Sequence, residues 1–247
     1  LIFGGQTPPG DTRRSEVEEY DGSTWTEVTD MPADISQLAG AGTQTAAVSI
    51  SGGPSIAESY EYDGTNWTAA GNINTSRERA AGFGTQTAAV AVGGGPPIVA
   101  NVEEYDGSSW TAATAYPTAV RMAAAAGTLT AGLVFSGDVP PVTNLTRSYD
   151  GTNWTNQPNM GTARQAGAGS GTSVAALMSG GADASGNSLK TTEEFNNSFQ
   201  VVTAGAWSSG GNIPTAVNGQ IGAGSKSAGL AALGHSTTAA QVTTIEY

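Results

Sequence analysis

The sequence of 247 residues has no cysteine and a single histidine, His235. Without cysteine there is no disulfide, no thiolate metal site and no cysteine nucleophile. One histidine cannot build a multi-histidine copper or zinc site, and no Gly-x-Ser-x-Gly turn is present to form a hydrolase triad with it. A phosphate-binding loop is also missing, because no glycine-rich stretch is followed by Lys-Ser or Lys-Thr. These absences argue against most catalysis, so we expect no enzyme, no metal and no cofactor.

Charged residues are scarce, at 12% of the chain, and nine Lys and Arg against 21 Asp and Glu give a net charge of -12. Such a chain repels nucleic acid and anionic membrane surfaces. No apolar run of about 18 residues is present to cross a bilayer, and no signal peptide is recognisable. We therefore expect no nucleic-acid partner and no membrane insertion. The strand-like start at Leu1 leads us to expect a piece of a longer polypeptide.

What the sequence has in abundance is glycine, with 35 residues, and one repeated hexapeptide. Glycine, with the many Ser, Thr and Ala residues, disfavours long helices. The hexapeptide reads Tyr-Asp-Gly-x-x-Trp, an aromatic strand end, a tight Asp-Gly turn and a tryptophan that opens the next strand. Its four copies run from Tyr20 to Trp25, Tyr62 to Trp67, Tyr105 to Trp110 and Tyr149 to Trp154, with tryptophan spacings of 42, 43 and 44 residues. A fifth, degenerate copy begins at Phe195 and reaches Trp207 after a longer loop.

Around each hexapeptide the same four strands are predicted. A Gly/Ala-rich strand is followed by an apolar strand that ends in glycine, by the strand before the turn, and by the tryptophan strand. The glycines that end the apolar strands are Gly53, Gly94, Gly137 and Gly181. Repeats of 40–50 residues with four strands are typical of propeller blades. The sequence predicts an all-β fold, a β-propeller of four-stranded antiparallel blades that forms a single domain over residues 1–247.

The strand count favours six blades, with the first and last incomplete, and a seven-bladed parent is the alternative. We expect the Gly/Ala-rich strand to be innermost, where only small side chains fit. The repeated aromatic pairs should then fill the space between blades, although aromatic faces could also stack on sugars. Trp207 breaks the spacing, so we expect it to be the exposed aromatic residue and a candidate ligand contact.

The repeats resemble the Kelch repeat, in which an apolar strand ending in Gly-Gly precedes a Tyr, a Trp about six residues later, and often Met-Pro and Arg. The match here is Val48 to Gly53, Tyr62 and Trp67, with Met31-Pro32 and Tyr116-Pro117 at the Met-Pro position. The phrase Tyr-Asp-Gly-Thr-Asn-Trp-Thr with its flanks is most similar to Kelch-like repeats of marine bacteriophage tail-fibre and virion proteins. Kelch-like oxidases need a copper site with two histidines, which this chain lacks.

The resemblance implies a non-enzymatic structural or adhesion domain, located in a virion or otherwise soluble. Its partners would be host-surface glycan or neighbouring virion and tail proteins, and homo-oligomers could form through flanking sequence. Two alternatives stay open: an interaction scaffold of a cellular Kelch protein and, more weakly supported, a sialidase-like glycan hydrolase. The hydrolase needs a carboxylate pair and an arginine cluster, and no acidic pair stands out.

Two recurring sets of charged residues are candidate sites. Asp21, Asp63, Asp106 and Asp150 recur in the hexapeptides, but one aspartate per blade cannot supply six oxygens to a calcium ion, so turn formation is favoured. Arg79, Arg121 and Arg164 stand at or near the arginine position of the repeat, before the innermost strand. We expect them near one mouth of a central channel, where a guanidinium could bind an anionic sugar. Local ion pairing is the simpler interpretation.

Overall fold

The computed structural model describes residues 1–7 and 12–197 in full, and beyond them the backbone of strands 206–209, 221–225, 228–235 and 240–246. The 22 strands of the described residues form antiparallel sheets, and no helix of these residues is long and apolar enough to cross a membrane. The chain divides into two compact units, Leu1–Ala119 and Val120–Tyr247, which are described separately.

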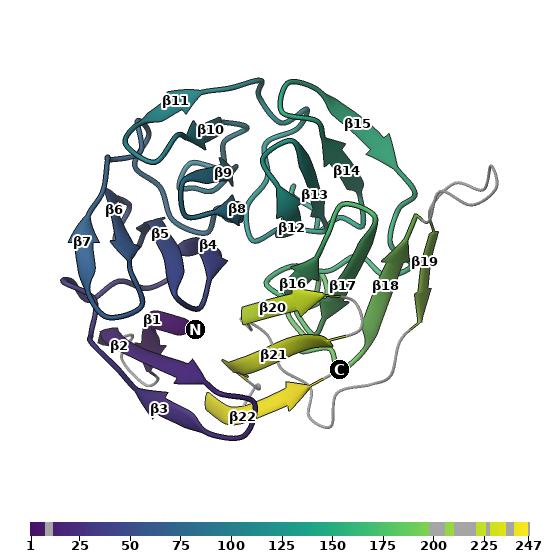
Figure 1. Cartoon of the computed structure of the whole chain (residues 1–247). Helices are drawn as coiled ribbons and strands as arrows, with labels where there is room; N and C mark the ends of the chain where they lie inside the picture. Colours follow the sequence, from purple (N-terminus) through teal and green to yellow (C-terminus); the bar gives the residue numbers. More distant parts are fainter. Residues whose placement is uncertain (8–11, 198–205, 210–220, 226–227, 236–239, 247) are drawn as a thin grey trace. The chain divides into compact units, whose positions relative to one another are not determined.

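Unit 1 contains three sheets of consecutive strands (Figure 1). The first is β1 (Ile2–Thr7), β2 (Thr12–Tyr20) and β3 (Trp25–Glu27). The second is β4 (Ala39–Thr43), β5 (Ala46–Gly52), β6 (Ile56–Tyr62) and β7 (Trp67–Ala69). The third is β8 (Ala81–Thr85), β9 (Ala88–Val92), β10 (Val102–Tyr105) and β11 (Trp110–Ala112).

Unit 2 repeats the plan. Its first sheet is β12 (Ala124–Thr128), β13 (Ala131–Phe135), β14 (Thr146–Tyr149) and β15 (Trp154–Gln157). The next is β16 (Ala168–Gly171), β17 (Ala175–Ser179), β18 (Thr192–Asn196) and β19 (Ala206–Ser209). The last three strands, β20 (Ile221–Ser225), β21 (Ala228–His235) and β22 (Ala240–Glu246), form a three-stranded sheet.

The predicted blade number is wrong. We count a sheet as a blade when it includes the strand that carries the tryptophan of the repeat. The described strands of this kind are β3, β7, β11, β15 and β19. The propeller therefore has five blades, one of three strands and four of four, in place of six or seven. The sheet β20–β22 contains the first three strand types of a repeat without the fourth. The sequence count treated every glycine-ended apolar strand as a blade, and so included this sheet.

Small side chains are required where Gly/Ala-rich strands of neighbouring sheets meet. In unit 1, β4 lies beside β8, and a Cβ added to Gly82 would be 2.8 Å from the carbonyl oxygen of Gly40. In unit 2, β12 lies beside β16, and a Cβ on Gly169 would be 2.9 Å from the Ala124 methyl group. Backbone approaches this close exclude larger residues, which is why these strands are rich in Gly and Ala.

The two aromatic residues of each hexapeptide pack against each other, and several of them are part of the core. Tyr62 and Trp67 lie opposite each other on β6 and β7, with ring centroids 5.0 Å apart, and pack against residues of the preceding sheet that include Val17. Tyr105 and Trp110 pack in the same way against Val48 of β5, and both are buried. Tyr149 and Trp154 also stack, at 4.5 Å, whereas Tyr20 and Trp25 pair at 5.0 Å but stay half-buried.

The tyrosine hydroxyls also link consecutive sheets. Tyr62 donates to Glu19 at 3.0 Å and Tyr105 donates to Glu61 at 2.8 Å. Burial, followed by these hydrogen bonds, raises the pKa of each of the two tyrosines to about 12. In unit 2 the aromatic on β18 is Phe195, which has no hydroxyl, and the residue of β14 that corresponds to the glutamates is Ser148. At this position, both the tyrosine and the glutamate of the hydrogen-bonded pair are thus replaced.

A glycine with positive φ stands where each apolar strand ends, and we call this position the corner glycine. Two of these glycines donate a hydrogen bond from their amide to the connector before the next sheet. The corresponding glycines are Gly5, Gly52, Gly94, Gly137 and Gly181, all with positive φ, so Gly53 lies one residue beyond the repeated position assigned to it from the sequence. The amide of Gly52 donates to the carbonyl oxygen of Arg77 at 3.0 Å, and the amide of Gly137 donates to that of Arg164 at 2.8 Å. A Cβ on Gly94 would lie 2.8 Å from the carbonyl oxygen of Glu78, so the corner needs glycine for space as well as for φ.

Candidate functional site

The segments between a tryptophan strand and the next Gly-rich strand, here called the connectors, carry all three arginines that the sequence suggested. The connectors are residues 28–38, 70–80, 113–123 and 158–167. In each, the first residue of the Gly-rich strand follows the tryptophan by 14 residues. Arg79, Arg121 and Arg164 stand two, three and four residues before that strand. They therefore occupy three different positions of the repeat.

Arg164 is fully buried and is part of the core. Its side chain is 0% exposed, and its Nη2 lies 2.7 Å from Oε1 of Glu193 on β18. The guanidinium also donates to the carbonyl oxygens of Gly180 and Thr191 and to the Thr191 hydroxyl. Burial lowers the pKa of Arg164, and Glu193 acts against that shift. No face of this guanidinium is left for a ligand.

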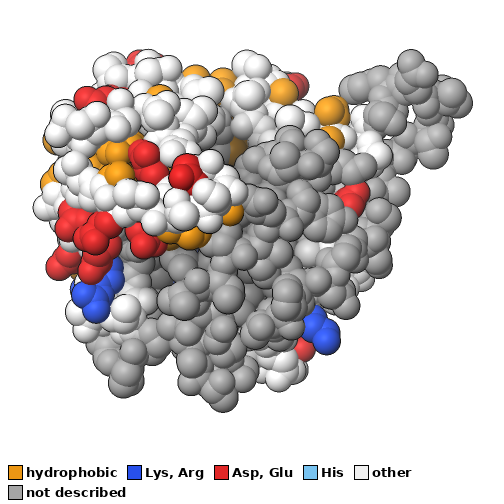
Figure 2. Space-filling model, turned by 60° about the horizontal axis from the view of Figure 1, so that its bottom comes forward, with side chains coloured by type: hydrophobic (Ala, Val, Ile, Leu, Met, Phe, Trp, Pro, Cys, Tyr) orange, Lys and Arg blue, Asp and Glu red, His pale blue; other side chains and the backbone are white. Residues whose placement is uncertain are grey.

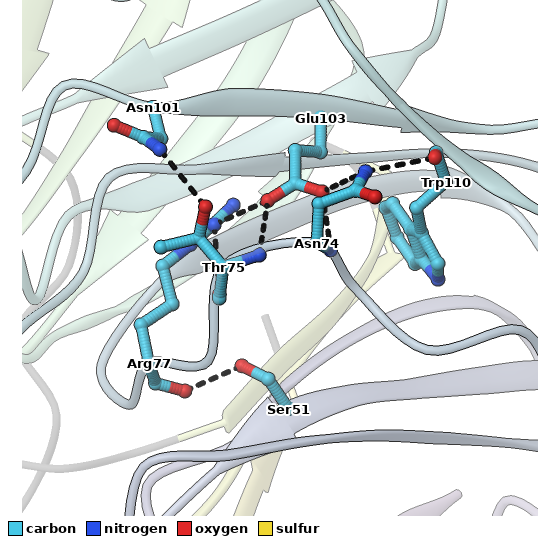
Figure 3. A network of polar contacts seen from close by, with 7 residues as sticks. All are labelled: Ser51, Asn74, Thr75, Arg77, Asn101, Glu103 and Trp110. Carbon is cyan, nitrogen blue, oxygen red and sulfur yellow. Dashed lines mark hydrogen bonds and ion pairs between the residues drawn. The ribbon is translucent and has the colours of Figure 1, made fainter.

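Arg77 is the true counterpart of Arg164 and was missed in the sequence. It follows Trp67 by ten residues, as Arg164 follows Trp154, so alignment on the tryptophans identifies it. Figure 3 shows its Nη1 directed at Glu103, 2.6 Å away, with both side chains at most 2% exposed. The same carboxylate accepts hydrogen bonds from the amides of Asn74 and Thr75 and from the Asn74 side chain. Four donors thus neutralise and solvate one buried carboxylate.

The connectors exist in two versions that differ together at three positions. In the ionic version Arg77 pairs with Glu103 and Arg164 pairs with Glu193, while Asn74 or Gly161 supplies a further amide donor to the carboxylate. In the apolar version a proline and an aliphatic residue take the first two positions, Pro32 and Ile35 in one repeat and Pro117 and Val120 in another, while the third position holds Tyr60 or Arg147. The two versions alternate along the chain, and in the sequence Pro214, Val217 and Ile245 continue the alternation.

Backbone chemistry explains why the three positions change together. Proline has no N–H, so Pro32 cannot donate to a carboxylate as Asn74 and Gly161 do. Where that donor is absent, a buried glutamate would lose part of its solvation, and beside Pro32 the chain uses the apolar pair of Ile35 and Tyr60 instead. Ile35 is 1% exposed, and the partly buried Tyr60 packs against the same cluster.

Arg121 and Arg79 are the two connector arginines that reach the surface. Arg121 binds Oδ2 of Asp138 through both Nε and Nη2, at 2.8 and 2.7 Å, and its side chain is 28% exposed. Arg79 donates from Nε to Oε1 of Gln37 at 2.7 Å and lies 3.5 Å from the carboxylate of Glu78. Arg79 also has a positive φ of 61°, as do Gln37, Met122 and Ala166 at the same position, so that conformation belongs to the repeat.

The other residues suggested by the sequence take structural places. Each hexapeptide aspartate closes its own turn: Oδ1 of Asp106 accepts the amides of Ser108 and Ser109 at 2.8 Å. The hydrogen bond from Ser109, then those from Ser108, lowers the pKa of Asp106 to about 2. No group of three or more His, Cys, Asp or Glu side chains among the described residues is arranged to hold a metal ion. Trp207 pairs with Phe195 in register, as other tryptophans do, but its side chain lies outside the described part.

One feature of the repeat varies freely, the loop between its second and third strands. These variable loops are residues 53–55, 93–101, 136–145 and 180–191. From the corner glycine to the aromatic residue the chain takes 10, 11, 12 and 14 residues in successive repeats, counted from Gly52, Gly94, Gly137 and Gly181. From the first residue of the Gly-rich strand to the corner glycine the chain always takes 13 residues.

Because successive strands are antiparallel, the variable loops and connectors lie at one end of each sheet and the hexapeptide turns at the other. We call these the loop end and the turn end.

Acidic side chains gather in a patch at the left of the face drawn in Figure 2, and basic side chains lie directly beside this patch. The buried ionic connectors use two arginines, and Asp138 neutralises a third. Positive charge available to an anionic ligand is therefore limited, in line with the net charge of -12.

Comparison with known proteins adds evidence on the fold. No protein-family model and no curated protein matches the sequence. The chain is similar to the solved structure of YjhT, with a TM-score of 0.77 and 12% identity, over 100% of this chain and 95% of that one. At this identity the likeness concerns the fold alone. Together with the sheets described above, it identifies the fold as a β-propeller with small antiparallel blades.

Proposed function

We propose that this chain is a non-enzymatic binding domain of a virion or tail protein, which contacts host-surface glycan through its loop end. Support comes from where the repeats differ. The connectors, corners and hexapeptides keep fixed lengths, whereas every change in length between complete repeats up to Phe195 falls in the variable loops. In repeat proteins, insertions that collect on one face often mark the binding face.

The chemistry of the loop end also favours binding over catalysis. Two of the arginines before the Gly-rich strands are buried beside glutamates, which leaves no arginine cluster of the kind a sialidase-like hydrolase needs. The variable loops offer exposed prolines, among them Pro54, Pro96 and Pro140. Rigid, partly apolar loops on a fixed scaffold bind ligands without a large entropy cost. The virion setting rests on the similarity of the repeats to phage tail-fibre proteins.

A glycan array tests the proposal. The wild-type chain should bind a defined subset of bacterial surface glycans. A variant in which residues 183–186 are deleted, so that Gly181 and Phe195 stand ten residues apart as Gly52 and Tyr62 do, should bind at least ten times more weakly. The matched control changes the turn end: Ser108→Thr with Ser109→Asn copies the turn at Thr65 and Asn66 and should bind as wild type. Absence of binding by the wild-type chain would contradict the proposal, as would equal binding by the loop variant.

A further inference from the structure

One polar cluster at the loop end of unit 1 is not used by the repeat. Arg79 and Glu78 come from the connector before β8, and Gln37 and Ser36 come from the connector before β4. The two connectors are tied by the amide of Arg79, which donates to the carbonyl oxygen of Gln37 at 2.8 Å, and by the Arg79 Nε bond to Gln37. The backbone therefore fixes the base of the Arg79 side chain.

Arg79 keeps most of its donors free. Its contacts among the described residues are the Nε bond to Gln37 and the 3.5 Å approach to Glu78, so the two Nη groups have no partner there. The side chains of Arg79 and Glu78 are 27% and 16% exposed, which places them at the surface but partly out of water. Hydrogen bonds made at such partly desolvated groups are stronger than those of fully hydrated ones.

The Glu78 carboxylate lies beside Gly53, in the variable loop of the neighbouring sheet. A Cβ added to Gly53 would lie 2.8 Å from Oε2 of Glu78 and 3.0 Å from Oγ of Ser36. The loop backbone thus passes directly over the carboxylate, and the exposed Pro54 follows it. The cluster therefore combines the guanidinium donors of Arg79, the carboxylate acceptor of Glu78 and the adjacent Pro54.

We propose that this cluster binds a neutral saccharide through two neighbouring hydroxyl groups. This inference rests on the proposed function and assigns its ligand class. Each sugar hydroxyl both donates and accepts, so one can accept from the Nη groups of Arg79 while its neighbour donates to Glu78. The cluster has no net charge, and an anionic sugar would meet the Glu78 carboxylate and the acidic surface. A neutral ring meets no such repulsion, and its C–H face suits a proline surface.

The same positions in the other described connectors lack this combination. They hold Ser36 with Gln37, Arg121 with Met122, and Gln165 with Ala166. The guanidinium of Arg121 is already paired with the carboxylate of Asp138, with Nη2 and Oδ2 2.7 Å apart. The saccharide site is therefore assigned to Glu78 and Arg79 alone among these connectors.

The test is titration calorimetry of the whole chain with neutral oligosaccharides, using as probe the best neutral binder on the array. Arg79→Gln installs the residue found at the equivalent position 37, and Glu78→Gln removes the charged acceptor. Each should weaken binding at least tenfold. The control Arg121→Gln removes a surface arginine of another connector and should leave binding unchanged. Melting temperatures within a few degrees of wild type would show that the variants are folded.

The outcomes separate this site from the wider proposal. If the wild-type chain binds neutral glycans and Arg79→Gln binds them equally, the site is wrong while the binding function stands. If only sialylated or other acidic glycans bind, the ligand class is wrong. If no glycan binds the wild-type chain, both proposals fail.

Discussion

At the scale of single residues, the role of a side chain is decided by partners far away in the sequence. Arg77 and Ile35 stand at the same position of the repeat and are both buried, one with a glutamate and one with a tyrosine. Arg79, two residues on, faces the surface. Sequence inspection grouped arginines by proximity to the Gly-rich strand and so selected one buried residue and two surface residues. Counting from the tryptophan would have separated them.

The first prediction concerns the ionic connector. Arg77→Ile alone leaves Glu103 buried without its counter-ion and should lower the free energy of unfolding by about 3–5 kcal/mol. The triple variant Asn74→Pro, Arg77→Ile and Glu103→Tyr reproduces the apolar connector of Pro32, Ile35 and Tyr60. Replacement of a buried ion pair by a packed apolar pair is often neutral, so most of the loss should be recovered. Urea denaturation measures both.

The control for this prediction is Arg14→Gln, which removes the half-exposed ion pair with Glu16 and should cost about 0–1 kcal/mol. If the triple variant were no more stable than Arg77→Ile, the two connector versions would not be interchangeable. That result would mean that other residues of each sheet are adapted to its own version.

At the scale of elements, the hexapeptide was predictable because its turn and its aromatic pair are local. Asp-Gly fixes the turn, and the four residues between Tyr and Trp fix the register in which the two rings face each other. The ionic connector was not predictable in this way, because Glu103 lies 26 residues from Arg77 and is separated from it by two strands. The blade number failed for a similar reason, since strand types could be read locally but their pairing could not.

The second prediction uses the hexapeptide turn. The pKa of Asp106 is about 2, below the value of roughly 3.9 expected for the unfolded chain. Its ionised form therefore stabilises the fold above about pH 4, and this contribution is lost as the pH falls from about 4 through 2. Asp106→Asn keeps the side-chain oxygen that accepts the two amides but not the charge. The difference in melting temperature between wild type and Asp106→Asn should be present at pH 6 and shrink towards zero at pH 2.

The control is Ser108→Thr with Ser109→Asn, which copies the turn at Thr65 and Asn66 and keeps Asp106 with the two backbone amides that it accepts. This variant should keep the pH dependence of the wild-type melting temperature. A difference between wild type and Asp106→Asn that stayed constant from pH 6 to pH 2 would refute the role assigned to the Asp106 charge.

At the scale of the whole molecule, the repeats separate what must stay constant from what can change. Three of the four intervals in a repeat are fixed in length from Trp25 to Trp154, and the variable loops absorb the differences. The 42-, 43- and 44-residue spacings of the tryptophans therefore report loop length. The general fold could be inferred from this periodicity. The candidate saccharide site could not, because it depends on the approach of Gly53 to Glu78 across two sheets.

The third prediction tests this division by insertion. Two glycines added between Pro140 and Pro141 lengthen a variable loop and should lower the melting temperature by only a few degrees, because loop closure entropy rises slowly with length. The same two glycines added after Thr162 displace the amides that bind Glu193 and should cost several times more stability. Equal losses of stability from the two insertions, measured by thermal denaturation, would show that the length of this loop is as constrained as that of the connector.

The two connector versions have a consequence for how such a gene can be rearranged. Residues that must match, such as Asn74, Arg77 and Glu103, all lie between one hexapeptide and the next. The heptapeptides that begin at Tyr62 and Tyr149 are identical, Tyr-Asp-Gly-Thr-Asn-Trp-Thr. An unequal crossover within these stretches inherits every arginine together with its own glutamate, and every proline together with its own aliphatic partner. The gene can therefore gain or lose repeats by recombination within the hexapeptide turns. Such a change does not separate a buried arginine from its glutamate.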